Sequence, residues 1–433
     1  MRALFGALLV AFVLTLPSYA DAARVWSSGC ELQTPNQNDG ADAEWNATGS
    51  QGSAFTISTS VFHSGLASCR FAVTSGSYEI MFQDFADNSS APWYMRAYVY
   101  FDAAPSSNSQ FMVMSNSDDE GAIGIGTDMT LRLYGDDMTT VQATAASALS
   151  TGTWYRIEWF FEAGGSSIVR VDGTEVLNDA TNDGDAAGDL LLGPIGINFG
   201  GTTQTIYFDD VAINSDLGAA QTSWPGAGNI IHLQADSAGD NNGCSAGTYA
   251  DVDEVIPDGD TSFCVLDADT GGDILDVNAE SSSSGGVDSY DTVTLVQVGV
   301  RERQVSAAAA TWELRLKSAS GGTTSTGTAT SHNDTTYKTN GDLNPATPGN
   351  YTLTSYTDPT TGIAWTPTGT NSLDNMQYGI NCTDCNPDTR VTTLWALVEY
   401  VDGAAPGATE KMRARINGGR LKVQGGRFKL QSN

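Results

Sequence analysis

The sequence predicts an all-β protein of two tandem antiparallel β-sandwiches, or jelly rolls, with a short basic β tail at the C-terminus. Of the 433 residues, 40% are hydrophobic and 47 are glycine, which is typical of strands joined by tight turns. Alternating strand patterns recur on both sides of a Pro- and Gly-containing break at 224–228. A chain of this length can bury more than one core, so we expect two.

The clearest strand pattern lies between residues 153 and 176. Side chains of 154–161 alternate between two faces, and a second extended run, 168–171, follows two glycines. Asp172-Gly173 is a strong hairpin signal, and an extended pattern resumes after it. The stretch predicts consecutive antiparallel strands with one large aromatic face.

The sequence segments WYRIE at 154–158 and VDG at 171–173 resemble the central hairpin of laminin-G-like, concanavalin-type jelly rolls. Segments similar to other strands of that family stand at 61–71, 94–101 and 206–213. The resemblance covers roughly residues 25–215. It implies a first β-sandwich, which we assign to 23–215.

Within this resemblance, an acidic residue after the first strand and an Asp of the closing strand commonly share a structural Ca²⁺. The matching positions are Glu31 and Asp210, with Asp209 beside it. Two carboxylates inside an apolar strand also need a cation or several hydrogen-bond donors. Because successive strand residues face opposite sides, we expect only one of the two Asp side chains to face a given site. Two solvated carboxylates at a sheet edge are the alternative.

Aromatic side chains are the best indication of a ligand. Trp93, Tyr134 and Trp154 are predicted to form a flat surface for a sugar ring, because aromatic faces stack on apolar C–H surfaces. Trp154 and Trp159 lie on opposite faces of one predicted strand, so at least one of them belongs to the core.

No catalytic motif stands out. Jelly-roll glucanases of this general fold carry a Glu-x-Asp-x-Glu strand with two carboxylates on one face, whereas Glu158 and Glu162 here have the wrong spacing. His63, His232 and His332 lie in no motif with a Ser, Cys or carboxylate partner. We expect a non-enzymatic protein, and a polysaccharide-degrading enzyme on the same fold is an alternative.

The start of the chain predicts export. A basic residue, an uncharged apolar stretch at 3–16 and small residues up to Ala22 form a signal peptide over 1–22. The stretch is too short for a membrane span, and no other segment is apolar enough. Export to the extracellular space or a particle surface follows. A net charge of −31 makes nucleic-acid binding by the body of the protein improbable.

Six cysteines agree with export, because disulfides persist in oxidising compartments. Several connectivities are open from sequence alone. We favour the three local pairs, Cys30 with Cys69, Cys244 with Cys264 and Cys382 with Cys385. A redox or zinc role for the last pair is less favoured, since no second Cys pair or His stands beside it.

Residues 216–228 are predicted to be a linker, and 229–403 a second jelly-roll sandwich. The second part resembles a jelly-roll domain of phage and prophage virion-associated proteins through 249–254, 257–262, 292–303, 312–317 and 356–365. That family brings no catalytic motif. Virion proteins assemble in the cytoplasm, so this resemblance conflicts with the signal peptide.

The tail, 404–433, is Gly-rich and repeats a seven-residue unit with basic side chains. Its glycines exclude a coiled coil and favour two short strands. We predict self-assembly or docking to a protein partner through Arg420, Lys422, Arg427 and Lys429.

Together these features predict a structural or adhesive surface protein that binds glycans through its first sandwich. A virion tail or capsid-decoration protein without glycan binding is the other alternative.

Overall fold

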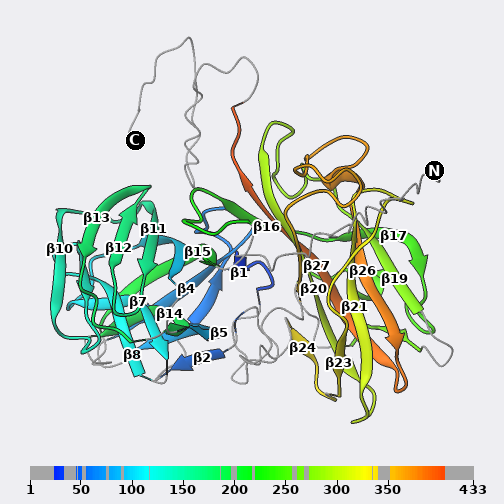
Figure 1. Cartoon of the computed structure of the whole chain (residues 1–433), viewed down its shortest axis with the longest axis horizontal. Coiled ribbons are helices and arrows are strands. Elements are labelled where there is room, and N and C mark those ends of the chain that lie inside the picture. The colour runs from blue at the N-terminus through cyan, green and yellow to red at the C-terminus, as the bar shows by residue number, and fades with distance from the viewer. Residues whose placement is uncertain are drawn as a thin grey trace, which may run out of the picture.

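The computed structural model of the chain describes residues 24–33, 45, 47–50, 55–74, 78–88, 92–116, 118–185, 187–196, 202–216, 220–255, 261–267, 273–333, 335–339 and 352–404. The predicted signal peptide, 1–22, and the predicted assembly residues Arg420, Lys422, Arg427 and Lys429 lie outside these residues. In the described part, the helices are two 3-10 turns, η2 (Tyr249–Asp251) and η3 (Leu373–Asn375). Four antiparallel sheets form two β-sandwiches (Figure 1), so the predicted fold class is confirmed.

The first sandwich consists of two sheets. Sheet A has the order β13-β12-β11-β6-β15-β4-β3, with β1 paired to β15, and sheet B has the order β10-β9-β8-β7-β14-β5-β2. The strands of sheet A are β1 (Arg24–Ser28), β3 (Phe55–Ser58), β4 (Ser68–Val73), β6 (Trp93–Phe101), β11 (Trp154–Phe161), β12 (Ser167–Val171), β13 (Thr174–Asp179) and β15 (Gln204–Ser215). The strands of sheet B are β2 (Ala47–Ser50), β5 (Glu79–Asn88), β7 (Ser109–Asn116), β8 (Asp118–Ile125), β9 (Thr130–Tyr134), β10 (Val141–Ala148) and β14 (Ala187–Gly196).

The second sandwich also has two sheets. In sheet C the order is β16-β27-β20-β24, with β18 on β27 and β25 on β20, and in sheet D it is β17-β19-β26-β21-β22, with β23 on β21. The strands of sheet C are β16 (Asn229–Leu233), β18 (Cys264–Leu266), β20 (Thr292–Gln304), β24 (Lys338–Thr339), β25 (Thr352–Ser355) and β27 (Thr389–Val401). The strands of sheet D are β17 (Ala235–Asn242), β19 (Asp273–Ala279), β21 (Ala310–Lys317), β22 (Ser325–Thr326), β23 (Thr330–His332) and β26 (Gln377–Asp384).

The predicted hairpin is present at the edge of sheet A. β11 pairs antiparallel with β12, and β12 pairs with β13. Asp172 and Gly173 join β12 to β13 with φ of 51° and 85°. Both residues lie in the left-handed region, as a tight hairpin turn requires. Trp159 is fully buried while Trp154 stays partly exposed, so the strand alternates as expected.

Each sandwich has its own hydrophobic core. Residues from Trp26 to Ile213 form the first large cluster, and residues from Ile231 to Tyr400 form the second. Trp159 and Trp312 are the largest fully buried side chains of the two clusters. Burial of such large aromatic rings contributes much of the apolar surface removed from water.

The cysteines are paired as predicted, Cys30 with Cys69, Cys244 with Cys264 and Cys382 with Cys385. The first disulfide fastens the segment after β1 to β4, and the second fastens β18 to the segment after β17. Across the described residues, no helix has the length and apolar character needed to span a membrane.

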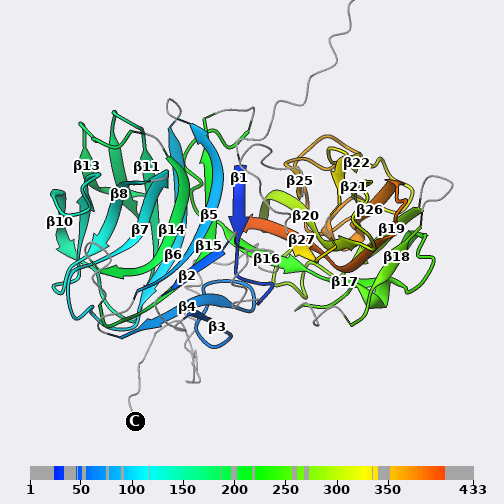
Figure 2. The ribbon, with the colours of Figure 1, turned by 90° about the horizontal axis from the view of Figure 1, so that it is seen from below.

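The two sandwiches stand side by side, with β1 and β16 between them (Figures 1 and 2). Glu399 of β27 lies 2.8 Å from Arg24 of β1 and 2.6 Å from Arg96 of β6, and all three side chains are buried. Burial alone would raise the pKa of Glu399, but the two guanidiniums lower it to about 2. A buried ion cluster therefore joins the second sandwich to the first.

The segment that connects the sandwiches packs on sheet A. The ring of Trp224 lies 5.7 Å from that of Tyr94, and the Arg170 guanidinium lies 3.9 Å over the Trp224 ring. Gly226 N–H donates to Glu158 at 2.8 Å, and Gly226 C=O accepts from Arg96 at 3.3 Å. The connecting segment is therefore held on sheet A by the Trp224 ring and by the Gly226 backbone.

Candidate functional site

The predicted acidic site lies at a β-bulge in β15. The register of β15 against β6 shifts between Asp209 and Ala212, and Asp210 has a φ of 48°. Both Asp side chains consequently contact the loop that contains His63 and Ser64. The expectation that only one of them faces a given site is wrong, because the bulge interrupts the alternation of the strand.

The two Asp carboxylates are held by different donors. Asp209 Oδ2 accepts from His63 N–H at 2.7 Å, and its Oδ1 accepts from Asp210 N–H at 2.8 Å. Asp210 Oδ1 accepts from Ser64 Oγ at 2.6 Å and from Ile230 N–H at 2.5 Å, while its Oδ2 lies 2.5 Å from His63 Nδ1. Because Ile230 belongs to β16, Asp210 also ties the two sandwiches together.

Glu31 completes the acidic cluster from the segment after β1. Its side chain is buried, and its Oε1 and Oε2 accept from Leu66 N–H at 3.0 and 3.1 Å. Gly65 has a φ of 61°, and a Cβ there would lie 1.9 Å from Glu31 Oε1. The position therefore requires glycine for both its backbone conformation and its space.

Crowding of negative charge changes the proton affinity of this cluster. Burial of Asp209, together with the charges of Asp210 and Glu31, raises its pKa well above the ordinary value. A bound cation or a set of donors can offset such crowding.

The hydrogen-bond donors to these carboxylates come from the protein itself. All six carboxylate oxygens of Glu31, Asp209 and Asp210 have a hydrogen-bonding partner. Within the described residues, no group of three or more His, Cys, Asp or Glu side chains is arranged to hold a metal ion. These residues do not fit the predicted calcium site as they lie here, because their ligand oxygens already accept from backbone, hydroxyl and imidazole groups.

The Ser64, His63 and Asp210 side chains do not form a nucleophilic triad. Ser64 Oγ bonds to Asp210 Oδ1 at 2.6 Å and to Ile230 C=O at 3.1 Å. His63 Nδ1 contacts the other oxygen of Asp210. A serine nucleophile needs a base that takes its proton, and the carboxylate here accepts from both neighbours instead.

Two of the three predicted ligand-binding aromatics are buried. Trp93 is 3% exposed and packs 4.4 Å from Phe85 in the first core, because β6 turns it inward. Tyr134 is also 3% exposed, in a small apolar cluster with Val113 and Leu191. Neither ring offers a face to a sugar, so placing them in a surface platform is wrong. Trp154 remains partly exposed.

Trp154 is surrounded by rings that the sequence reasoning missed. His63 stacks on Tyr98 with 3.7 Å between ring centroids and lies 5.9 Å from Trp154. Tyr100 lies 5.5 Å from Trp154 and 5.5 Å from Tyr207. We call these five side chains the ring group. Tyr98 and Tyr100 alternate with core residues along β6, so the period of two in 94–101 was the signal that could have found them.

Polar side chains border the ring group. Arg70 bonds to Tyr207 at 3.3 Å and to Thr56 at 3.3 Å. Arg156 bonds to Glu158 at 3.1 Å. Burial raises the pKa of Tyr98, while the nearby Arg96 lowers it by a smaller amount, so its hydroxyl stays protonated. The arrangement joins flat apolar faces to fixed donors.

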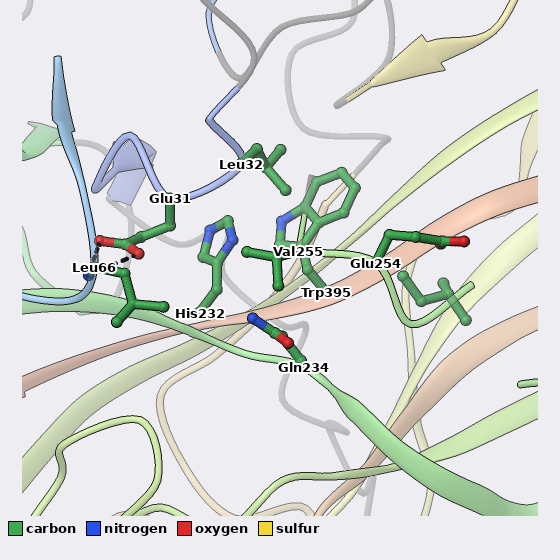
Figure 3. Close-up of a pocket in the computed structure, with 9 residues that line it drawn as sticks. Glu31, Leu32, Leu66, His232, Gln234, Glu254, Val255 and Trp395 are labelled. Carbon is green, nitrogen blue, oxygen red and sulfur yellow. Dashed lines mark hydrogen bonds between the residues drawn. The ribbon is translucent and has the colours of Figure 1, made fainter. Parts of the chain in front are cut away.

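A small hollow lies where the sandwiches meet (Figure 3). It is lined by Glu31, Leu32, Leu66, His232, Gln234, Glu254, Val255, Leu394 and Trp395. His232 stacks on Trp395 with 6.2 Å between centroids, and burial lowers the pKa of His232 to about 3. Glu31 accepts from the Leu66 backbone (Figure 3), and Glu254 accepts from Ser262 Oγ at 2.6 Å. The hollow therefore presents a neutral imidazole and two carboxylates that already accept hydrogen bonds.

The sequence matches no protein-family profile and no curated protein. Among solved structures it is similar to the cellulose-induced protein Cip1, with 18% identity, 46% of this chain and 99% of that chain covered, and a TM-score of 0.35. Carbohydrate-binding module CBM66 from Bacillus subtilis has 9% identity over 39% of this chain and 94% of its own, with a TM-score of 0.29. Alginate lyase AlgAT5 of polysaccharide lyase family 7 has 13% identity over 39% of this chain and 84% of its own, with a TM-score of 0.31.

These matches are distant structural similarities, and the proteins they name include one carbohydrate-binding module and one lyase. At such low TM-scores and identities, neither a ligand nor an activity of this chain follows from them.

Proposed function

We propose that this chain is a non-enzymatic, exported glycan-binding protein whose sugar-contacting surface is the ring group of sheet A. The observation that carries the proposal is the continuous contact of the five rings, from Tyr98 through His63, Trp154 and Tyr100 to Tyr207. Three disulfides support an oxidising, extracellular location.

The chemistry of the ring group suits a saccharide. Pyranose rings carry flat C–H faces that stack on aromatic side chains, and their hydroxyls need fixed polar partners at the rim. His63, Tyr98, Tyr100 and Trp154 are partly exposed, and Arg70 and Arg156 provide donors beside them. Tyr207 is buried and supports Tyr100 from within the sheet face, so the exposed rings are the ones that a sugar would contact. Sheet strands hold all these residues except His63, so the surface is formed before ligand arrives.

A binding role agrees with the state of Glu158, which pairs with Arg156 at the border of the ring group. Glu158 is 1% exposed and accepts from Arg156 at 3.1 Å and from Gly226 N–H at 2.8 Å. A glycosidase acid or nucleophile must reach the bond that it cleaves, and a second carboxylate must stand on the same side. Glu158 is instead committed to holding the connecting segment.

Calorimetric titration of the purified full chain with neutral and acidic oligosaccharides tests the proposal. Trp154→Ala is expected to weaken binding by about five- to thirtyfold, because loss of one stacked ring removes about 1–2 kcal/mol. Tyr249→Ala, which truncates a half-buried ring of the second sandwich, is the control and is expected to leave binding unchanged.

Chromatography of the same mixtures separates the alternatives. Release of shorter saccharides would replace the binding role with a polysaccharide-degrading enzyme. Binding of no saccharide, together with concentration-dependent assembly that is lost on deleting 411–433, would favour a purely structural surface or virion protein.

A further inference from the structure

Arg301, Arg303 and Arg390 lie at the end of sheet C where β24 pairs with β20 (Figure 1). Their strand neighbours Val300 and Val391 belong to the second core, so alternation puts the arginines on the opposite face of the sheet. Arg303 of β20 stands directly opposite Arg390 of β27, and Arg301 stands opposite Thr393. The chain has only 20 basic residues against 51 acidic ones, so a local excess of positive charge is unusual here.

Aromatic rings support the guanidiniums. The Arg390 guanidinium lies 4.3 Å over the Phe263 ring. Arg301 and Arg303 lie 5.3 and 5.0 Å from the centre of the Tyr337 ring. Stacking on a ring fixes the plane of a guanidinium and leaves its outer N–H groups free to bind an anion.

Several polar groups at this place lack a partner. Nε of Arg303 and Nε of Arg390 are buried without a hydrogen bond in the described part of the chain, as are the Tyr337 hydroxyl and Thr393 Oγ1. Among the described residues, Arg303 donates to one acceptor, the Thr335 carbonyl, at 3.3 Å. No ion pair of the described residues involves Arg303 or Arg390, whereas Arg24, Arg96 and Arg315 each have a carboxylate within 4 Å.

An arrangement like this destabilises the folded protein when nothing is bound. Like charges directly opposite on neighbouring strands repel each other. Buried donors without an acceptor lose the hydrogen bonds that they made with water. One bound oxyanion removes the repulsion, because it neutralises the two guanidiniums and accepts from their outer N–H groups.

We propose that Arg303 and Arg390 form a binding site for the carboxylate or sulfate group of an acidic glycan. The assignment to a sugar rests on the proposed function, whereas the oxyanion chemistry rests on the arginines alone. A long nucleic acid suits this place less well, since a chain with a net charge of −31 repels an extended polyanion. The rings of Phe263 and Tyr337 are also occupied by guanidiniums and are not open for stacking bases.

Calorimetric titration of the full chain tests the site with three probes of equal length, a galacturonate oligomer, a sulfated galactose oligomer and a neutral galactose oligomer. Arg303→Gln and Arg390→Gln are each expected to weaken binding of an acidic oligomer about ten- to a hundredfold, because each removes a charge-assisted hydrogen bond. The double variant is expected to abolish it. The acidic oligomer that binds more tightly identifies the group as carboxylate or sulfate.

Arg132→Gln is the matched control, since it makes the same change of charge on an arginine that pairs with Asp128 in the first sandwich. It is expected to leave the affinity for acidic oligomers within twofold of wild type. Arg390→Lys keeps the charge but loses the planar fork, and is expected to bind with intermediate affinity.

The two proposals fail in different ways. A Trp154→Ala variant that no longer binds the neutral oligomer but still binds the acidic one would support both the ring group and the arginine site as binding surfaces. Wild-type protein that binds no acidic oligomer, or a folded double variant that binds as tightly as wild type, would overturn the arginine site. Tighter binding of single-stranded DNA than of both acidic oligomers would assign the site to nucleic acid instead.

Should a Gln variant fail to fold, competition on the wild-type chain decides the question. Inorganic sulfate is expected to displace the acidic oligomer at an ionic strength at which chloride does not. Equal displacement by chloride would show screening of the overall charge and would contradict a specific site.

Discussion

A cluster of two arginines lies near each end of strand β27, and only the cluster at the C-terminal end includes a carboxylate. At its C-terminal end Glu399 lies between Arg24 and Arg96, and each of them has its anion within the chain. At its N-terminal end Arg390 faces Arg303, with no carboxylate paired to either in the described residues. The first cluster has a carboxylate for both guanidiniums and joins two sandwiches, and Nη2 of Arg96 is its one buried nitrogen without a hydrogen bond among the described residues. The second cluster has buried Nε donors and no anion among the described residues. The comparison distinguishes arginines that stabilise the fold through an ion pair from arginines that we propose to bind a ligand anion.

Removing the Glu399 carboxylate makes the cluster of Arg24 and Arg96 resemble that of Arg303 and Arg390, because neither then has an anion. Glu399→Ala leaves two buried arginines without an anion, and we expect it to lower the free energy of unfolding by about 3–5 kcal/mol. Urea unfolding followed by tryptophan fluorescence measures the change. Asp128→Ala removes an exposed partner of Arg132, and is expected to lower the free energy of unfolding far less, because solvent screens that pair. Equal effects of the two would mean that burial adds nothing to the Glu399 cluster.

Asp210 is the second point at which charge joins the sandwiches. Asp210→Ala removes the acceptor of Ile230 N–H and Ser64 Oγ, and places alanine at a φ of 48°. We expect a loss of about 2–4 kcal/mol in the same urea assay. Asp210→Asn keeps one acceptor oxygen and tolerates the left-handed conformation, so it is expected to lose about half as much. An alanine variant as stable as wild type would contradict this role.

Acid affects the junction in two windows of pH. Burial lowers the pKa of His232 to about 3 in the folded chain. Below pH 6.5 the imidazole is therefore protonated in the unfolded chain and stays neutral in the folded chain. Stability therefore falls as the pH drops from 6.5, by at most about 1.4 kcal/mol per pH unit. The pKa of Glu399 is about 2, so its contribution is present above pH 4.5 and is lost as the pH falls toward 2.

Urea unfolding at a series of pH values tests the first window. The difference in stability between His232→Gln and wild type is expected to shift in favour of the variant between pH 6.5 and 4.5, where Glu399 does not titrate. A difference that stays constant over that window would show that the wild-type imidazole accepts its proton in the folded protein.

Adding a carboxylate makes the second arrangement resemble the first. Arg303→Glu places an anion opposite Arg390, and is expected to raise the free energy of unfolding by about 0.5–1 kcal/mol while abolishing binding of acidic oligomers. Arg132→Glu is the control, since a new carboxylate beside Asp128 is expected to be slightly destabilising. Loss of stability in the Arg303→Glu variant would mean that the guanidinium is needed for packing on Tyr337.

Local patterns predicted much of this fold. The alternation of 154–161 and the Asp172-Gly173 turn specify β11, β12 and β13, because both depend on neighbours in the sequence. The three cysteine pairs are also close in sequence, with separations of 39, 20 and 3 residues. Short loops make such pairings the simplest ones for the chain to close.

The candidate sites depend on contacts that local patterns do not contain. Arg96 and Glu399 are 303 residues apart, and their pairing is set by how the sandwiches meet. Burial of Trp93 and Tyr134 is decided by the packing around each sheet, which alternation alone does not give. The bulge at Asp210 rests on a left-handed non-glycine residue, for which the strand sequence carries no signal.

Calcium gives the smallest expected effect. The six oxygens of Glu31, Asp209 and Asp210 already have protein partners, so an ion would have to displace them before it could bind. We expect the melting temperature to be the same in EDTA and in excess CaCl₂, because a ligand stabilises a protein only when it binds the folded state. A rise of several degrees in CaCl₂ that disappears in Glu31→Gln would instead establish the calcium site that the family resemblance implies. Asp183→Asn, which changes a carboxylate in an exposed turn of the same sandwich, is the control for a nonspecific effect of the ion.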